Sequence, residues 1–219
     1  MKNSTDGSFV PLKTRATPKQ VRAQIRITEI LDATSKLLGD HDPHKVSALM
    51  IAKSASIPVS SIYRYFPVVE DIFEELYFQT TEAVKTDVFA IYSDPITYPG
   101  WRDRLHGALS VLRTYFEHHP YYARLLQSHV SRTGLETTDD KSSDSMSRFL
   151  AEHWKNGGDG FTGGDPAIVS NVTMIIFLGV ENFLASQRDH EDTSAYFAAL
   201  SLNLETYLAH YLSDDRTSQ

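Results

Sequence analysis

Two short helices separated by a tight turn are predicted around residues 55–67, ASIPVSSIYRYFP. The turn signal is SIP at 56–58, because proline cannot continue a helix that precedes it. Ile62 and Phe66 are four positions apart and therefore share one side of a short helix expected over residues 59–66. The other side of that helix carries small and polar residues, so the helix is expected to present a surface to a partner.

Helical periodicity continues on both sides of this stretch. A first helix is expected over residues 18–38, because a proline opens it and Gly39 is a stop signal. Ser47 is placed to cap a second, short helix, and a long fourth helix is expected to begin at Pro67. The inward side of the second helix is expected to carry Leu49, Ile51, Ala52 and Ala55.

The rest of the chain has helical spacing as well. Further helices are predicted over residues 101–119, 121–130, 144–155, 166–187 and 193–212. The glycine-rich segment GGDGFTGG at 157–164 is expected to be an exposed, mobile loop. No alternating strand pattern is present, so the predicted fold is all-α, with an N-terminal three-helix domain followed by a second helical domain.

The composition of the 219-residue chain is that of an ordinary soluble protein, with 41% hydrophobic and 22% charged residues. The absence of cysteine excludes disulfides, thiolate metal sites and cysteine nucleophiles, and fits a reducing compartment. The longest apolar run, at 172–180, is about half the length of a bilayer span, and no secretory leader opens the chain. A cytoplasmic protein without membrane contact is therefore expected.

Positive charge is concentrated near the N-terminus. Residues 1–70 carry ten Lys or Arg against six Asp or Glu, a balance of +4, so the net charge of −7 leaves −11 for the remainder. A basic end on an acidic body is typical of a protein that meets a polyanion at one end, although a basic tail without a partner has the same pattern. Residues 1–17 lack periodicity and are expected to form a flexible basic arm.

The order helix, short helix, tight turn, short helix is that of a helix-turn-helix, whose last helix enters the DNA major groove, about 12 Å wide. Ser60 and Ser61 give this helix a small hydrogen-bonding surface, and Tyr63 and Arg64 can reach phosphates. Residues 18–67 are therefore interpreted as a domain that binds double-stranded DNA. The residues expected to contact DNA are Ser47, Lys53, Val59, Ser60, Ser61, Tyr63 and Arg64.

Two segments, ILDATSKLL at 30–38 and VSALMIAKSASIPVSSIYRYFPVVEDIFEEL at 46–76, agree in spacing with a known pattern. Over residues 21–77 the chain resembles the TetR family of transcriptional repressors. The resemblance implies a regulator that acts as a homodimer, with two recognition helices in successive major grooves of an operator. It also implies that residues 68–219 form a helical dimerisation domain where a small-molecule effector binds and releases the operator.

Four positions depart from the pattern of the family. Ser56 stands where many members have glycine, at a position that can require a positive φ. Pro58 replaces the usual capping serine, and Val59 and Val69 stand where many members have lysine. Fewer basic side chains predict weaker nonspecific binding to DNA.

Two other classes of function fit an all-helical chain. One is an interaction protein of the same fold that does not bind an operator, which the missing lysines would allow. The other is an all-α enzyme, but the sequence contains no phosphate-binding loop, nucleophile motif or paired Glu/His motif. No enzymatic activity, catalytic residue, cofactor or metal site is expected, and the histidines at 41, 44, 118 and 119 are interpreted as loop or helix-end residues.

The helix expected over 166–187 carries two stripes of apolar residues. One is expected to build a dimer interface together with the last helix, although an internal core would have the same spacing. The residues expected at that interface are Ile168, Val172, Ile175, Ile176, Gly179, Phe183, Phe197, Leu200, Leu204, Tyr207, Leu208 and Tyr211.

The second stripe is apolar in its middle and polar at both ends. It is expected to face the interior of the protomer, either as ordinary core or as the wall of an effector site. Glu181 is the residue expected to orient a ligand, because a glutamate among aromatic side chains needs a partner. The residues expected to contact the effector are Leu109, Phe116, Phe149, His153, Trp154, Asn171, Met174, Phe177 and Glu181.

Overall fold

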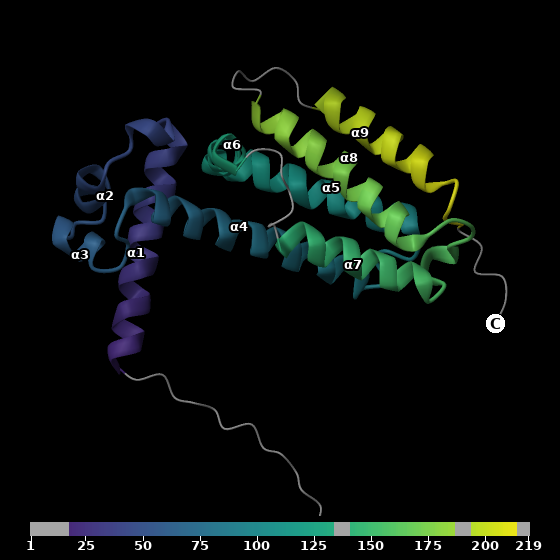
Figure 1. Ribbon diagram of the computed structural model, residues 1–219, viewed down its shortest axis with the longest axis horizontal. Helices are drawn as coiled ribbons and strands as arrows, with labels where there is room; N and C mark the ends of the chain where they lie inside the picture. The colour runs from purple at the N-terminus through teal and green to yellow at the C-terminus, as the bar shows by residue number, and fades with distance from the viewer. Residues whose placement is uncertain (1–17, 134–140, 187–193, 214–219) are drawn as a thin grey trace, which may run out of the picture.

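The computed structural model describes residues 18–133, 141–186 and 194–213, and no β-strand occurs among them (Figure 1). The all-α fold predicted from the sequence is confirmed. The α-helices are α1 Pro18–Asp40, α2 Ala48–Ser54, α3 Val59–Tyr63, α4 Val69–Tyr92, α5 Trp101–His118, α6 Pro120–Thr133, α7 Lys141–Lys155, α8 Pro166–Ser186 and α9 Ser194–Leu208. Two short 3-10 helices, η1 Pro43–Lys45 and η3 Gly158–Gly160, lie in the connections.

Helices α1, α2 and α3 form a compact head at one end of the molecule (Figure 1). Ile30, Ile51 and Ile62 come from the three helices and are all fully buried in one core, which the start of α4 completes with Ile72. Burying an isoleucine side chain stabilises a fold by roughly 1.5–3 kcal/mol. This core therefore fixes α3 rigidly against α1, despite the shortness of α3.

The remaining helices form an elongated body along α4, which leaves the head and runs the length of the body (Figure 1). The body has its own core, which includes Trp101 of α5, Trp154 of α7 and Leu204 of α9. Helix α6 lies where head and body meet, since its Leu125 belongs to the core of the head. None of the described helices has the length and hydropathy needed to cross a membrane.

The helices of the head differ in detail from the sequence-based expectations. Helix α1 continues through Gly39 to Asp40, and α3 ends at Tyr63 rather than at Phe66. Leu49 was expected to face inward, but 68% of it is exposed. A seven-residue helix can turn only one face to α1, and in α2 that face is Ala48, Ile51 and Ala52.

The expectation of an exposed, mobile loop at 157–164 is wrong at its centre. The Asp159 side chain is 2% exposed, and the Phe161 ring stacks between those of Trp154 and Tyr211. Gly157 and Gly160 have positive φ values of 79° and 59°, which allow the chain to turn sharply on both sides of Asp159. The glycines therefore serve to insert this aspartate into the body.

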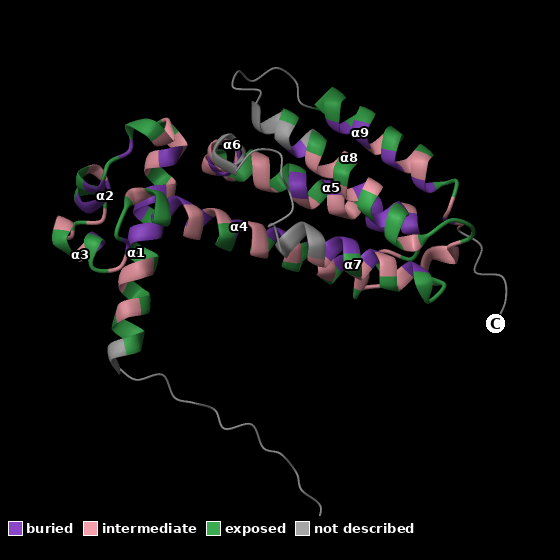
Figure 2. Ribbon diagram, in the orientation of Figure 1, coloured by how far each residue is buried: buried purple, intermediate pink, exposed green. Residues whose placement is uncertain are grey.

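One of the two stripes assigned to a dimer interface lies in the core instead. Phe197, Leu200, Leu204 and Leu208 of α9 are buried inside the protomer, so their assignment to an intersubunit contact is wrong. Their spacing was compatible with either environment, and packing of α9 against α5 and α8 decided it. On α8, by contrast, Ile168 and Ile175 are 62% and 67% exposed. Figure 2 shows exposed and partly buried segments alternating along α8.

Candidate functional site

The first candidate site is the surface formed by α2, α3 and the turn between them. Ser47 begins α2, because its Oγ accepts a hydrogen bond from the backbone N–H of Met50 at 3.4 Å. Ser56 ends α2 with a φ of 55°, in the left-handed region that favours glycine. Pro58 begins α3 without any side-chain hydrogen bond, using the φ of −64° that its ring imposes.

The outward side of this surface is polar. Ser60, Tyr63 and Arg64 are exposed in or next to α3, and Lys53 is exposed on α2. Ser47 is exposed as well, whereas Val59 and Ser61 are half-buried. All seven residues expected to contact DNA thus lie in α2, in α3 or directly beside one of these helices.

The second candidate site is a cavity of about 120 Å³ in the body. Helices α4, α5, α7, α8 and α9 all contribute to its wall, and α6 contributes Tyr122. Most of the wall is apolar, with a small number of polar side chains. This is the usual character of a small-molecule site.

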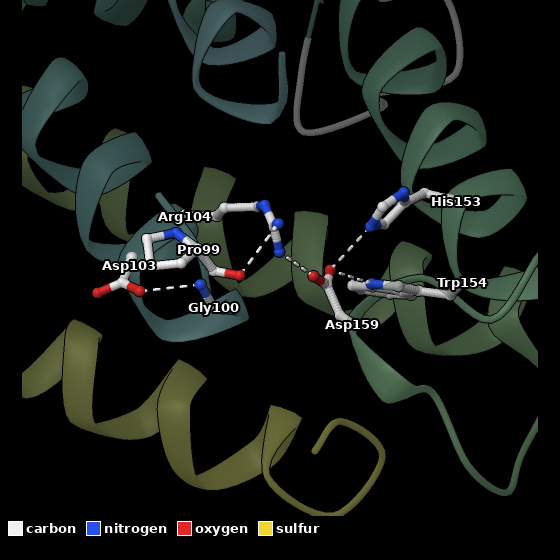
Figure 3. Close-up of polar contacts among 7 residues, drawn as sticks. All are labelled: Pro99, Gly100, Asp103, Arg104, His153, Trp154 and Asp159. Atoms are coloured by element: carbon white, nitrogen blue, oxygen red, sulfur yellow. Dashed lines mark hydrogen bonds and ion pairs between the residues drawn. The ribbon is translucent and has the colours of Figure 1, made fainter. Parts of the chain in front are cut away.

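Asp159 borders the cavity, as does Tyr92, the last residue of α4. Figure 3 shows the polar contacts of Asp159. Its carboxylate forms an ion pair with the guanidinium of Arg104, accepts a hydrogen bond from Trp154 Nε1 at 3.1 Å and lies 3.2 Å from His153 Nε2. Burial alone raises the pKa of Asp159, but His153, Arg104 and Trp154 together hold it below its ordinary value. Asp159 is therefore an ionised group whose charge is balanced locally.

The residues around this ion pair hold it in place. Arg104 also donates a hydrogen bond to the carbonyl of Pro99 at 3.4 Å, and Asp103 accepts one from the Gly100 N–H at 2.9 Å in the first turn of α5 (Figure 3). The neighbouring Tyr92 hydroxyl is kept neutral, because burial and then the charge of Asp159 raise its pKa.

Glu181 borders the cavity together with Tyr122 of α6. The Tyr122 hydroxyl donates a hydrogen bond to Glu181 Oε1 at 2.6 Å, and the two residues are 1% and 6% exposed. Burial, followed by the charge of Glu181, raises the pKa of Tyr122 well above its ordinary value. The tyrosine therefore remains a hydrogen-bond donor to the carboxylate.

Residues 30–76 match the model of the bacterial regulatory proteins of the tetR family. They cover most of α1, all of α2 and α3, and the start of α4. The N-terminal domain belongs to the TetR family. The prediction made from the sequence is thereby confirmed, and the matched segment contains every residue of the first candidate site.

Solved TetR-family structures share the fold over most of the chain. A TetR-family transcriptional regulator from Mesorhizobium loti is 15% identical, with a TM-score of 0.64 and coverage of 88% of this chain and 99% of that one. SmeT, the repressor of the Stenotrophomonas maltophilia multidrug efflux pump SmeDEF, is 16% identical, with a TM-score of 0.61 and coverage of 88% and 93%.

FadR, a fatty acid degradation regulator from Bacillus halodurans, is 15% identical, with a TM-score of 0.64 and coverage of 87% and 96%. At these identities the likeness shows a common fold and does not extend to ligands. No match was found among functionally curated proteins.

The residues expected to contact an effector divide into two groups. Trp154, Met174, Phe177 and Glu181 border the cavity. The others lie outside its wall, in the surrounding core or at the surface: Leu109, Phe116, Phe149, His153 and Asn171. Asn171 is exposed, and its side-chain oxygen accepts a hydrogen bond from Ser147 of α7.

Sequence reasoning missed Tyr122 and Asp159 as residues of the cavity. Tyr122 directly follows a Pro-Tyr pair at the start of α6, with no periodic signal for the direction in which it points. For Asp159 one signal was present: a single acidic residue among five closely spaced glycines, which is compatible with a sharp turn that inserts one side chain. Its partner Arg104 lies 55 positions away, beyond the reach of local patterns.

Helix α6 connects the cavity to the head. Tyr122 borders the cavity, while Arg124 donates a hydrogen bond to the carbonyl of Leu38 in α1, and Leu125 is buried in the core of the head. Tyr122, Arg124 and Leu125 lie within one turn of α6, so this helix contacts both the cavity and the head.

Proposed function

We propose that this protein is a sequence-specific transcriptional regulator that binds double-stranded operator DNA and is released from it by a small-molecule effector. The geometry of α2 and α3 carries the proposal: Ser60, Tyr63 and Arg64 are exposed on a helix that the buried Ile62 fixes to the head. A rigid helix with a small, polar outer side suits the major groove. Residues 18–67 are the proposed DNA-binding domain.

Arg64 and Tyr63 are the proposed phosphate contacts, and Ser60 and Ser61 the residues nearest the base edges. Lys53 and the hydroxyl of Ser47 would contact the backbone beside α2, and Val59 would pack against the groove at the start of α3. Phosphate contacts position a protein on DNA, whereas base contacts select the sequence.

The cavity in residues 68–219 is the proposed effector site. Support comes from its apolar wall with two buried carboxylates and from α6, which contacts both the cavity and α1. Occupation that displaces Tyr122 would shift α6 against α1 and change the position of the head. An effector that binds one head position more tightly than the other shifts the population between them.

The proposed assembly is a homodimer formed mainly through α8. Ile168, Ile175 and Phe183 of α8 are 62%, 67% and 39% exposed, and Leu202 of α9 is 67% exposed. Exposed apolar side chains gathered on adjacent helices are typical of a subunit interface. Two heads in one dimer would bind two half-sites of an operator.

Regulation of transcription places the protein in the cytoplasm, where its operator lies, and requires no catalysis. An alternative is a helical interaction protein of the same fold that does not bind an operator. The valines at 59 and 69 favour this alternative, because they stand where many family members have lysine. Binding of DNA discriminates between the two.

The test is a titration of duplex DNA with the full-length protein at several salt concentrations. An operator is first selected from a random-sequence pool by repeated binding to the wild type. Arg64→Ala should weaken binding to the operator and to a random duplex alike, and lower the salt slope by about one unit, because one phosphate contact is lost.

The control is Arg113→Ala, which removes another exposed arginine, from α5 in the body. It should leave both affinities and the salt slope unchanged. Equal slopes for the wild type and the Arg64 variant would refute the assignment of α3. Failure of the wild type to select any sequence would favour the interaction protein.

A further inference from the structure

One end of the cavity lies where α4 ends and α5 begins. Tyr92 is the last residue of α4 and Trp101 the first residue of α5, and both border the cavity. Arg104 shares a side of α5 with Trp101, three positions before it, and its guanidinium carbon lies 5.9 Å from the centroid of the Tyr92 ring. Since Arg104 also pairs with Asp159, these residues form one end of the cavity, here named the Asp159 end.

The indole N–H of Trp101 is buried at this end without an acceptor. Trp101 is 2% exposed, and its Nε1 has no hydrogen-bond partner among the described residues. The guanidinium of Arg102 lies over the indole, 4.2 Å from the ring centroid, and helps to hold it. An indole nitrogen can only donate, and a buried donor that is not hydrogen-bonded costs free energy. An acceptor on a molecule in the cavity would remove this cost.

Tyr92 supplies a second donor. Edge contacts with the rings of Phe149 and His153, at centroid distances of 5.2 and 5.6 Å, hold its ring in place. Its hydroxyl forms no hydrogen bond with another residue that the structure describes. The hydroxyl also stays protonated, because burial and the charge of Asp159 raise its pKa. Two donors at the Asp159 end therefore lack an acceptor.

The charges at this end favour an acceptor without charge. The guanidinium of Arg104 is engaged by Asp159, which also lies 3.2 Å from His153 Nε2. A ligand anion placed here would be repelled by the carboxylate of Asp159 in a medium of low dielectric constant. A ligand ammonium has donors only, so it could not accept from the indole N–H.

The wall beside these polar groups is apolar. Val88 of α4, Leu105 of α5, Leu150 of α7 and Leu208 of α9 all border the cavity. Contact with such side chains removes hydrocarbon from water and stabilises its binding. The remainder of a ligand at this end is therefore expected to be hydrocarbon.

From this geometry we infer that the effector is a mainly apolar molecule with an uncharged hydrogen-bond acceptor, such as the carbonyl oxygen of a ketone or an ester. This oxygen lies at the Asp159 end, where Trp101 Nε1 and the hydroxyl of Tyr92 donate to it. The inference rests on the proposed effector site and specifies the class of ligand that the site takes.

The probes are three molecules with ten carbon atoms: 2-decanone, decanoate and decylammonium. They present a neutral acceptor, an anionic acceptor and a group with donors only. Binding to the full-length wild type is followed by tryptophan fluorescence, since both tryptophans of the chain, Trp101 and Trp154, border the cavity. 2-Decanone should bind about tenfold more tightly than decanoate.

Tyr92→Phe removes one donor and keeps the ring. It should weaken binding of 2-decanone about fivefold, the usual effect of one neutral hydrogen bond, and change the affinity for decylammonium by less than about twofold. The control is Tyr196→Phe, which removes an exposed hydroxyl on α9 outside the cavity and should change neither affinity. Melting curves of both variants show whether they are folded.

A measurement on the wild type tests Trp101 without a substitution in the core. In ¹⁵N-labelled protein, the indole N–H resonance of Trp101 should move downfield when 2-decanone binds, because this group gains an acceptor. The resonance of Trp154 should move less, since its Nε1 already donates to Asp159.

Lack of binding of 2-decanone to the wild type overturns the inference, as does equal or tighter binding of decanoate. The same conclusion follows if folded Tyr92→Phe keeps the wild-type affinity for 2-decanone, or if the Trp101 resonance does not move. Operator binding is measured in parallel samples, so a failure of the inference is distinguished from a failure of the proposed function. Retained operator binding without these effects leaves the regulator intact and removes only the ligand class.

Discussion

At Asp159 a carboxylate is buried because three side chains supply it with donors or positive charge. Arg104 comes from α5, while His153 and Trp154 come from the end of α7 (Figure 3). The backbone of Asp159 is left-handed, with φ 56°, which is unfavourable for an aspartate by about 1 kcal/mol. The interactions of the carboxylate must therefore outweigh a strained backbone.

We predict that Asp159→Asn lowers the free energy of unfolding by about 3 kcal/mol. The variant leaves the guanidinium of Arg104 buried without its counter-ion, and such an uncompensated charge is costly. Urea denaturation of the full chain measures the change. Glu152→Gln, which removes a well exposed carboxylate on α7, should change stability by less than about 0.5 kcal/mol.

The contribution of the Arg104–Asp159 ion pair to stability should depend on pH. The pKa of Asp159 is lowered in the folded state, so its contribution is complete above the unfolded pKa of about 4 and is lost as the pH falls through the folded pKa. The difference in stability between wild type and Asp159→Asn should therefore shrink below about pH 4. A difference that stays constant down to acid unfolding would contradict the ion pair.

At the scale of elements, α2 and α3 begin in different ways. Helix α2 is capped by Ser47, whose side chain accepts a hydrogen bond from the backbone N–H of Met50. Helix α3 begins after Pro58 without a side-chain cap. Free N–H groups at a helix start cost stability unless a side chain or water accepts from them. The orientation of α3 thus depends on the burial of Ile62 more than on its own ends.

Ser47→Ala is therefore expected to lower the stability of the protein by about 1 kcal/mol, through loss of the cap of α2. The matched change is Ser60→Ala, which removes an exposed hydroxyl of α3 that makes no capping hydrogen bond. It should lie within about 0.5 kcal/mol of the wild type. Urea unfolding without DNA separates this effect from operator binding, and equal losses for both variants would refute the role of the cap.

At the scale of the whole molecule, α8 exposes the apolar side chains of Ile168 and Ile175, which contact with a second subunit would bury. Ile175→Glu places a charge on that face and should convert the proposed dimer into a monomer, because a charge buried at an interface is costly. Ile96→Glu is the matched control, since Ile96 is 91% exposed in the connection between α4 and α5.

Sedimentation velocity measures the outcome. The wild type and the Ile96 variant should sediment as dimers, and the Ile175 variant as a monomer with the same melting behaviour. A wild type that remains monomeric at every concentration would refute the proposed assembly. A dimeric Ile175 variant would move the interface to another surface.

The sequence by itself determined the helical fold, the DNA-binding motif and the approximate ends of most helices. These features depend on local physics: the spacing of Ile62 and Phe66, the cap at Ser47 and the turn at Ser56–Pro58 each act within a few residues. Even the positive φ at Ser56 followed from its place in the motif. Such signals can be read without knowing what packs against them.

Only the tertiary structure decided which apolar stripe is core and which is exposed, and which polar residues meet in the cavity. Leu204 and Ile175 have equivalent helical spacing, yet the first is fully buried and the second is 67% exposed. Periodicity defines a face but not its neighbour. The pairs Arg104–Asp159 and Tyr122–Glu181 join residues 55 and 59 positions apart, and only the packing of α5 against η3 and of α6 against α8 brings them together.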